Sequence, residues 1–240
     1  MSSLLEQCPP RAEQRGASEP AGAQPSAPAP SSLAEERANY LSHGVGALSS
    51  LLGVAALLRL AAARSSATLL ACSIYGLTLV LMFASSTAYH AVPATNERAK
   101  RALRTLDHSA IFLLIAGTYT ALSLAVPARI AATSLLTSVW LLSGFGILTL
   151  ARQGANRKRG PIAFYLALGA LVALALPALK GPLGTKGLLL LSSGGVVYTL
   201  GVPFYLARQM RFHHVIWHAF VLTASALHFL AVLGYVAARG

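Results

Sequence analysis

The stretch HHVIWHAFVLTASALHFL, residues 213–230, decides the fold because it is mostly apolar and close to the length that crosses a membrane. It also carries four of the seven histidines of the chain. An imidazole gains nothing from lipid, so these side chains either hydrogen-bond inside a helix bundle or bind a metal ion. The stretch therefore predicts a membrane helix whose polar residues have a specific task.

Similar apolar runs recur along the 240 residues, which are 55% hydrophobic and only 11% charged. This composition excludes a soluble domain and predicts an all-α membrane protein, a bundle of seven transmembrane helices. We expect these helices at about 40–60, 67–89, 106–126, 130–150, 161–178, 187–206 and 214–236. Residues 1–33 hold half of the twelve prolines, so they predict a disordered tail before a transmembrane domain at 34–240.

The net charge of +12 reflects the membrane topology, because the basic residues lie in the segments between the apolar runs. Thirteen lysines and arginines fall on the side that holds the tail and the loops after helices two, four and six, and six fall on the other side. The positive-inside rule therefore predicts a cytoplasmic N-terminus. No basic patch with interleaved aromatic residues occurs, so we expect membrane lipids as partners and no nucleic acid.

Asp107, in LDHSAIFLLIAGTYTAL, is the only aspartate in the chain. A carboxylate within a membrane span costs about 2.5 to 3.5 kcal/mol on insertion scales, so it usually faces the bundle interior and has a partner. The alternative is an exposed carboxylate that interacts favourably with a helix N-terminus.

Two pairs of polar residues have helical spacing. Ser86 and His90 are four residues apart near the end of the second helix, and His214 and His218 are four apart at the start of the seventh. Residues four apart lie on one face of a helix, so His214 and His218 can bind one metal ion together. With seven spans, the ends that carry His90, Asp107 and His214 lie on the same side of the membrane, so we expect them to converge.

The remaining histidines are weaker candidates for metal ligands. His213 is rotated about 100° from His214, which favours an interfacial position. His228 lies about 15 Å beyond His218 along the helix, which favours a hydrogen bond inside the bundle. The roles of His43 and His108, whether in packing, in support of a ligand or in proton transfer, stay open. Cys8 and Cys72 form no CxxC pattern and no disulfide framework, so histidines are the expected ligands.

Three neutral imidazoles suit Zn²⁺ and leave a fourth position for water, whose pKa zinc lowers to about 7. Asp107 has the chemistry to accept the proton of that water and to return it to a leaving group. Ser86 has the chemistry to hydrogen-bond a ligand, the water or an oxyanion. A site open to the bilayer would admit an acyl chain, which points to a lipid amide or ester as substrate.

The combination of SSTAYH, LDHSAIFLLIAGTYT and HxxxH followed by SALHF resembles the hemolysin III family. This family is the bacterial branch of the progestin and adipoQ receptor family. The resemblance covers nearly all of the chain after about residue 34, including ERANYLSHGVGAL. It implies seven helices, a cytoplasmic N-terminus and a multi-pass protein of the bacterial inner membrane.

The resemblance also implies zinc bound by His90, His214 and His218, with Asp107 and Ser86 close by. The wider superfamily includes alkaline ceramidases, which implies hydrolysis of a ceramide-like lipid amide. Val215 stands where many members have glutamate, a departure that affects interface or gating details and leaves the ligand set intact. Two other functions stay open: a cytolytic, channel-like hemolysin, and a receptor or membrane-homeostasis protein with structural zinc.

Overall fold

The structure is a computed structural model that describes residues 32–123, 129–153 and 160–238. Within these ranges every regular element is a helix, as predicted. The helices are α1 (Leu33–Ala62), α2 (Ser66–Ala91), α3 (Glu97–Ser123), α4 (Arg129–Gln153), α5 (Gly160–Ala170), α6 (Leu176–Leu206) and α7 (His213–Val232). A 3₁₀ turn (Leu171–Leu174) follows α5, and a π-helical turn (Leu233–Ala237) follows α7.

The N-terminal part of the predicted tail, residues 1–31, lies outside the described residues. So do six of the basic residues that entered the charge count, namely Arg11, Arg15, Arg157, Lys158, Arg159 and Arg239. The described chain begins with a capping box, in which the Ser32 hydroxyl accepts the Glu35 N–H and the Glu35 carboxylate accepts the Ser32 N–H. Helix α1 therefore starts at Leu33, ahead of the apolar run that was expected to begin near residue 40.

Five of the described helical segments are long and apolar enough to cross a membrane. They are α1, α2, most of α4, α6, and α7 with its π-helical turn. Helix α3 is not among them; its first turns carry charged side chains such as Glu97 and Arg101, and its more apolar part holds Asp107 and His108. The apolar segment Pro161–Leu174 is shorter than a full span.

The connection between α5 and α6 differs from the prediction. A fifth helix was expected to reach residue 178, yet the α-helix ends at Ala170 and α6 begins at Leu176. Pro177 lies in the first turn of α6, where a proline is tolerated because its missing N–H has no helical partner there. Gly184 then breaks α6 with φ 59° and ψ −177°, a conformation nearly restricted to glycine.

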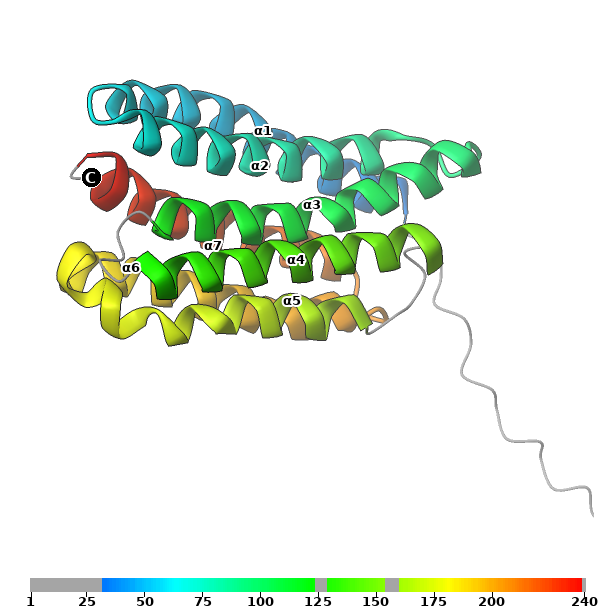
Figure 1. Cartoon of the computed structure of the whole chain (residues 1–240). Helices are drawn as coiled ribbons and strands as arrows, with labels where there is room; N and C mark the ends of the chain where they lie inside the picture. The colour runs from blue at the N-terminus through cyan, green and yellow to red at the C-terminus, as the bar shows by residue number, and fades with distance from the viewer. Residues whose placement is uncertain (1–31, 124–128, 154–159, 239–240) are drawn as a thin grey trace, which may run out of the picture.

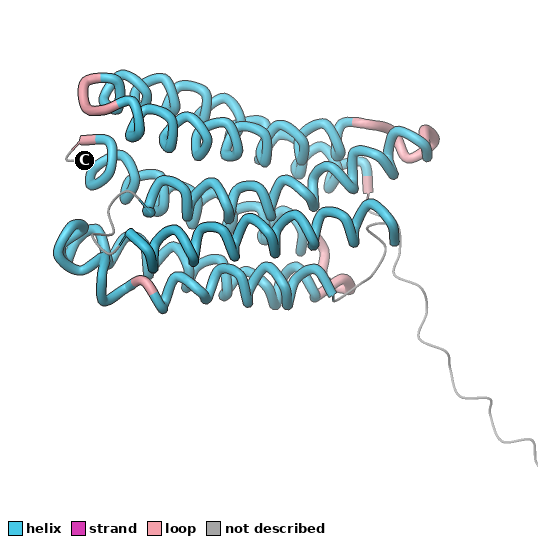
Figure 2. Tube along the Cα trace, in the orientation of Figure 1, coloured by secondary structure: helices cyan, strands magenta, loops and turns pink. Residues whose placement is uncertain are grey.

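The helices run along one another and form a bundle (Figure 1). Helix α2 packs against α1 and α3, α4 packs against α3, and α6 packs against α7, which in turn contacts α1. The described turns gather mainly at the two ends of the bundle (Figure 2). The α2–α3 connection and the start of α1 lie at one end, and the α1–α2 turn lies at the other (Figure 1).

Small residues allow the helices to approach closely, as is common in membrane bundles. A side chain at Gly117 would overlap Thr78, and one at Gly146 would overlap the ring of Phe112. Gly144, two residues before Gly146 on α4, has no atom within 4 Å of the position that a Cβ would take. Gly144 and Gly146 therefore differ in packing although both lie on α4.

We expect Gly146→Ala to destabilise the protein by about 1–3 kcal/mol, because the added methyl group forces the buried Phe112 ring to move. Gly144→Ala is the matched control and should be neutral or stabilising by up to about 1 kcal/mol, because alanine favours a helix. Thermal unfolding in detergent measures both changes. Equal effects of the two substitutions would contradict the close α3–α4 packing.

Candidate metal centre

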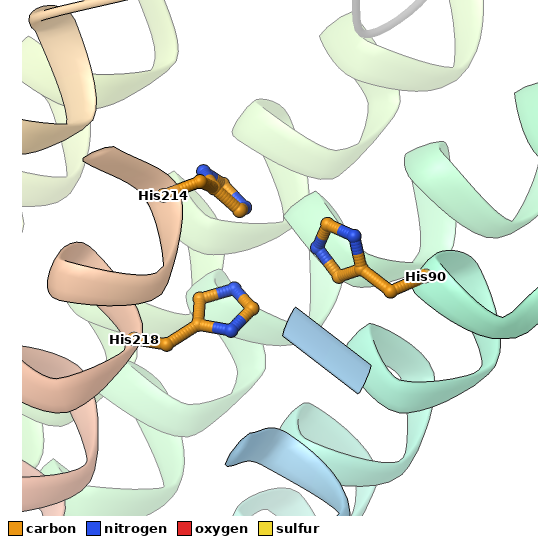
Figure 3. Close-up of side chains that lie close together, drawn as sticks. All are labelled: His90, His214 and His218. Atoms are coloured by element: carbon orange, nitrogen blue, oxygen red, sulfur yellow. The ribbon is translucent and has the colours of Figure 1, made fainter. Parts of the chain in front are cut away.

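His90, His214 and His218 converge near one end of the bundle. Each offers a ring nitrogen, and these nitrogens all lie within 4.8 Å of one another. Figure 3 shows His214 and His218 on successive turns of α7, with the His90 ring facing them from α2. His218 and His90 are 1% and 6% exposed, and His214 is half-buried. The three histidines therefore form a candidate metal site, with one ring nitrogen from each directed toward the same point.

The start of α7 is held by α1. Phe212 caps α7 in the left-handed conformation, with φ 56° and ψ 16°, which is unusual for a residue with a side chain. Its N–H donates a hydrogen bond of 2.8 Å to Glu35 Oε1. Because α7 begins at the next residue, this bond helps to fix where His214 and His218 lie relative to α1.

The environment of His90 fits a metal ligand. Its Nδ1 lies 3.0 Å from Glu36 Oε2, and its Nε2 is buried with no hydrogen-bond partner among the described residues. A metal-binding histidine typically donates its other ring N–H to a carboxylate or a carbonyl group. An unpaired buried nitrogen would cost about 1–3 kcal/mol, and a metal ion at the centre of the triad would remove this cost.

The two other predicted site residues border a cavity beside the triad. Asp107 and Ser86 line a cavity of about 690 Å³ together with His214 and His218. Ser86 is 2% exposed and lies one turn before His90 on α2. Asp107 Oδ2 lies 3.5 Å from His108 Nδ1, and the Asp107 side chain is 13% exposed. Asp107 is therefore largely buried, in contrast to the alternative of an exposed helix-terminal carboxylate.

The remaining histidines divide into neighbours of the triad and separate residues. The ring of His43 stacks on His218 with centroids 3.5 Å apart, and His43 also borders the cavity. His213 Nδ1 lies 3.1 Å from the carbonyl oxygen of Phe204, away from the triad nitrogens. His228 donates its Nε2–H to the carbonyl oxygen of Leu191 at 3.1 Å, the hydrogen bond inside the bundle that its position favoured.

Glu36 is the main residue that the sequence reasoning missed. It approaches His90 from 54 positions away in the chain, and Lys100 Nζ lies 3.4 Å from the same carboxylate oxygen. A signal was present, because Glu36, Asn39 and His43 have the spacing of one helical face at the start of a helix that is more apolar further along. The contact partner could not be read from that spacing.

Comparisons with known proteins identify the family of the chain. The family model described as Haemolysin-III related matches residues 31–229. The chain belongs to the hemolysin III family. It is 37% identical over 204 residues to a Hemolysin-3 homolog of Bacillus subtilis (strain 168), covering 85% of this chain and 95% of that protein. It is 34% identical over 203 residues to Hemolysin-3 of Bacillus cereus, covering 84% and 92%.

The chain is also similar to a protein from animals. The chain is 31% identical over 171 residues to the monocyte to macrophage differentiation factor of Homo sapiens, covering 68% of this chain and 69% of that protein. Membership of the hemolysin III family, with bacterial relatives, and the long apolar helices together identify a multi-pass bacterial membrane protein.

Proposed function

We propose that this hemolysin III protein is a zinc-dependent membrane hydrolase that cleaves a lipid amide, with a ceramide-like lipid as the model substrate. One observation carries the proposal: a single cavity of about 690 Å³ joins the histidine cluster to an apolar interior. That volume lies within the range of about 300–1,000 Å³ typical of small-molecule sites. The cavity thus offers reactive groups and a place for a lipid chain.

His90, His214 and His218 would hold the zinc ion. Zinc prefers neutral imidazole nitrogens, and three protein ligands leave one position open for a small molecule, the arrangement of catalytic zinc sites. A zinc ion bound there would supply a Lewis acid and would make water a nucleophile at neutral pH. The buried Nε2 of His90, which has no hydrogen-bond partner among the described residues, supports this assignment.

The lining of the cavity supports a lipid as substrate. The cavity is lined both by the polar residues Asp107, Ser86, His214 and His218 and by apolar residues, among them Ile111, Leu114, Leu122, Leu176 and Leu191. An acyl chain would bury its methylene groups against these residues, at about 0.8 kcal/mol for each buried group. The amide group of the lipid would then lie near Asp107 and Ser86.

Asp107 and Ser86 would serve the proton transfers of hydrolysis. The reaction joins the oxygen of water to the carbonyl carbon, breaks the C–N bond and moves one water proton to the leaving nitrogen. The Asp107 carboxylate would accept that proton and return it to the nitrogen. The Ser86 hydroxyl would donate a hydrogen bond to the carbonyl oxygen as negative charge develops there.

A direct assay tests the function. Purified zinc-loaded protein is incubated with a ceramide in detergent micelles, and the free fatty acid released is measured over time. We expect release that stops when zinc is removed by a chelator and resumes when zinc is restored. Release no faster than from protein-free micelles, across ceramides and simple acyl amides, would overturn the proposal.

We further propose seven membrane crossings with the N-terminus in the cytoplasm, so that α3 and α5 also cross. The basic residues near the α2–α3 and α6–α7 connections support this orientation: Arg98, Lys100, Arg101, Arg104, Arg208 and Arg211. Fewer basic side chains lie near the described turns at the opposite end, namely Arg59, Arg64, Lys180 and Lys186.

Thiol labelling tests this topology. In a chain with serine in place of Cys8 and Cys72, single cysteines are introduced at the exposed positions Ser66 and Thr95. In right-side-out membrane vesicles, an impermeant maleimide should label Ser66→Cys at once and Thr95→Cys only after permeabilisation. The reverse pattern would place the N-terminus outside.

A further inference from the structure

Helix α1 contributes no ligand to the histidine triad, yet it contacts two of the three. Glu36 Oε2 lies 3.0 Å from His90 Nδ1. Further along α1, Ser42 Oγ lies 2.9 Å from His218 Nδ1. In both cases the contact involves Nδ1 and leaves Nε2 for a metal ion.

The chemistry of the partners decides which ring nitrogen carries the proton. An ionised carboxylate only accepts hydrogen bonds, so a neutral His90 must donate from Nδ1 to Glu36. The Ser42 hydroxyl donates to the carbonyl oxygen of Asn39 at 2.8 Å, so its single proton is used. His218 must then donate its Nδ1–H to Ser42 Oγ. Both imidazoles consequently have their lone pair on Nε2.

Glu36 is itself held in place. Lys100 Nζ lies 3.4 Å from Glu36 Oε2 and donates hydrogen bonds to the carbonyl oxygens of Tyr89 and Val92, at 2.8 and 3.1 Å. These carbonyl groups belong to the last turn of α2, where His90 lies. The lysine therefore ties the Glu36 carboxylate to the helix end that carries the ligand.

From these contacts we infer that Glu36 is a positioning residue that commits His90 to bind metal through Nε2, and that Ser42 does the same for His218. The inference rests on the proposed zinc site, and it assigns to α1 the selection of the tautomers that the site requires. Neighbouring Glu35 has a different task, because its carboxylate binds the N–H groups of Ser32 and Phe212.

Nitrogen-15 NMR of histidine-labelled, metal-free protein tests the inference, because the two ring nitrogens have different shifts in each tautomer. His90 should carry its proton on Nδ1 in the wild type and should shift toward the Nε2–H tautomer in Glu36→Ala. Glu97→Ala is the control, since it removes an exposed carboxylate that pairs with Arg101 and should leave the His90 tautomer unchanged. Ser42→Ala should change His218 in the same way and leave His90 unchanged.

Zinc affinity provides the second readout. Loss of a residue that hydrogen-bonds a metal ligand typically lowers metal affinity about 10–100-fold, so we expect the zinc affinity of Glu36→Ala to fall by this amount. Glu36→Gln preserves side-chain volume and should cause a smaller fall, because a neutral amide accepts a weaker hydrogen bond. An Nε2–H tautomer of His90 in the wild type, or an unchanged His90 tautomer in Glu36→Ala, would overturn the inference. A wild type that binds no zinc defeats the proposed hydrolase, whereas the tautomer comparison still decides the role of Glu36.

Discussion

His214→Ala is expected to reduce zinc affinity more than about 100-fold, so that the purified protein retains little zinc. Loss of a hydrogen-bond partner of a ligand typically costs about 10–100-fold, and loss of a ligand itself should exceed that range. Three protein ligands are the usual number in catalytic zinc sites, and two histidines hold the ion weakly. Inductively coupled plasma mass spectrometry of the purified variant measures the zinc content, and competition with a chelator measures the affinity.

The adjacent histidine provides the control for this substitution. His213→Ala removes an imidazole of the same size one position away, but its Nδ1 contacts the carbonyl oxygen of Phe204. We therefore expect His213→Ala to retain the zinc content of the wild type. Full zinc occupancy in His214→Ala, or equal loss in both variants, would show that the triad is not the binding site.

The helical fold could be predicted well because it depends on local properties of the chain. Apolar runs of membrane length appear directly in the sequence, and the structure has helices at each of them. The turn between α5 and α6 was harder, because Pro177 can either end a helix or begin one. The break at Gly184 also has no sequence signature that distinguishes it from Gly181, three residues earlier.

The candidate site could be predicted in part for a similar reason. The i, i+4 spacing of His214 and His218 places them on one face of α7, and the expected number of spans predicted that the His90 end of α2 lies on the same side, where the structure has the three histidines together. The contacts of Glu36 with His90 and of Ser42 with His218 join positions 54 and 176 residues apart. Such contacts depend on how α1 packs against its neighbours, which spacing within one helix does not reveal.

Asp107→Asn is expected to retain zinc and to lower the rate of fatty acid release about 10²–10⁴-fold, the usual contribution of a general acid–base group. Asparagine has nearly the same shape as aspartate, so it preserves the lining of the cavity, but its amide cannot accept and return a proton. Zinc should stay bound because the proposed ligands are His90, His214 and His218, and Asp107 is not among them. The measurement pairs zinc content with the initial rate of release from a ceramide.

Glu97→Gln is a suitable control because it removes a carboxylate from the same helix at an exposed position paired with Arg101. It should leave both zinc content and release unchanged, since exposed ion pairs contribute little. Unchanged release in Asp107→Asn would remove this carboxylate from the mechanism. If Asp107→Asn loses both zinc and fatty acid release, Asp107 has a role in holding the metal site. If the wild type binds zinc but hydrolyses no lipid, the zinc is structural. Retained zinc with lost release is the only one of these outcomes that places the proton transfers of hydrolysis on Asp107.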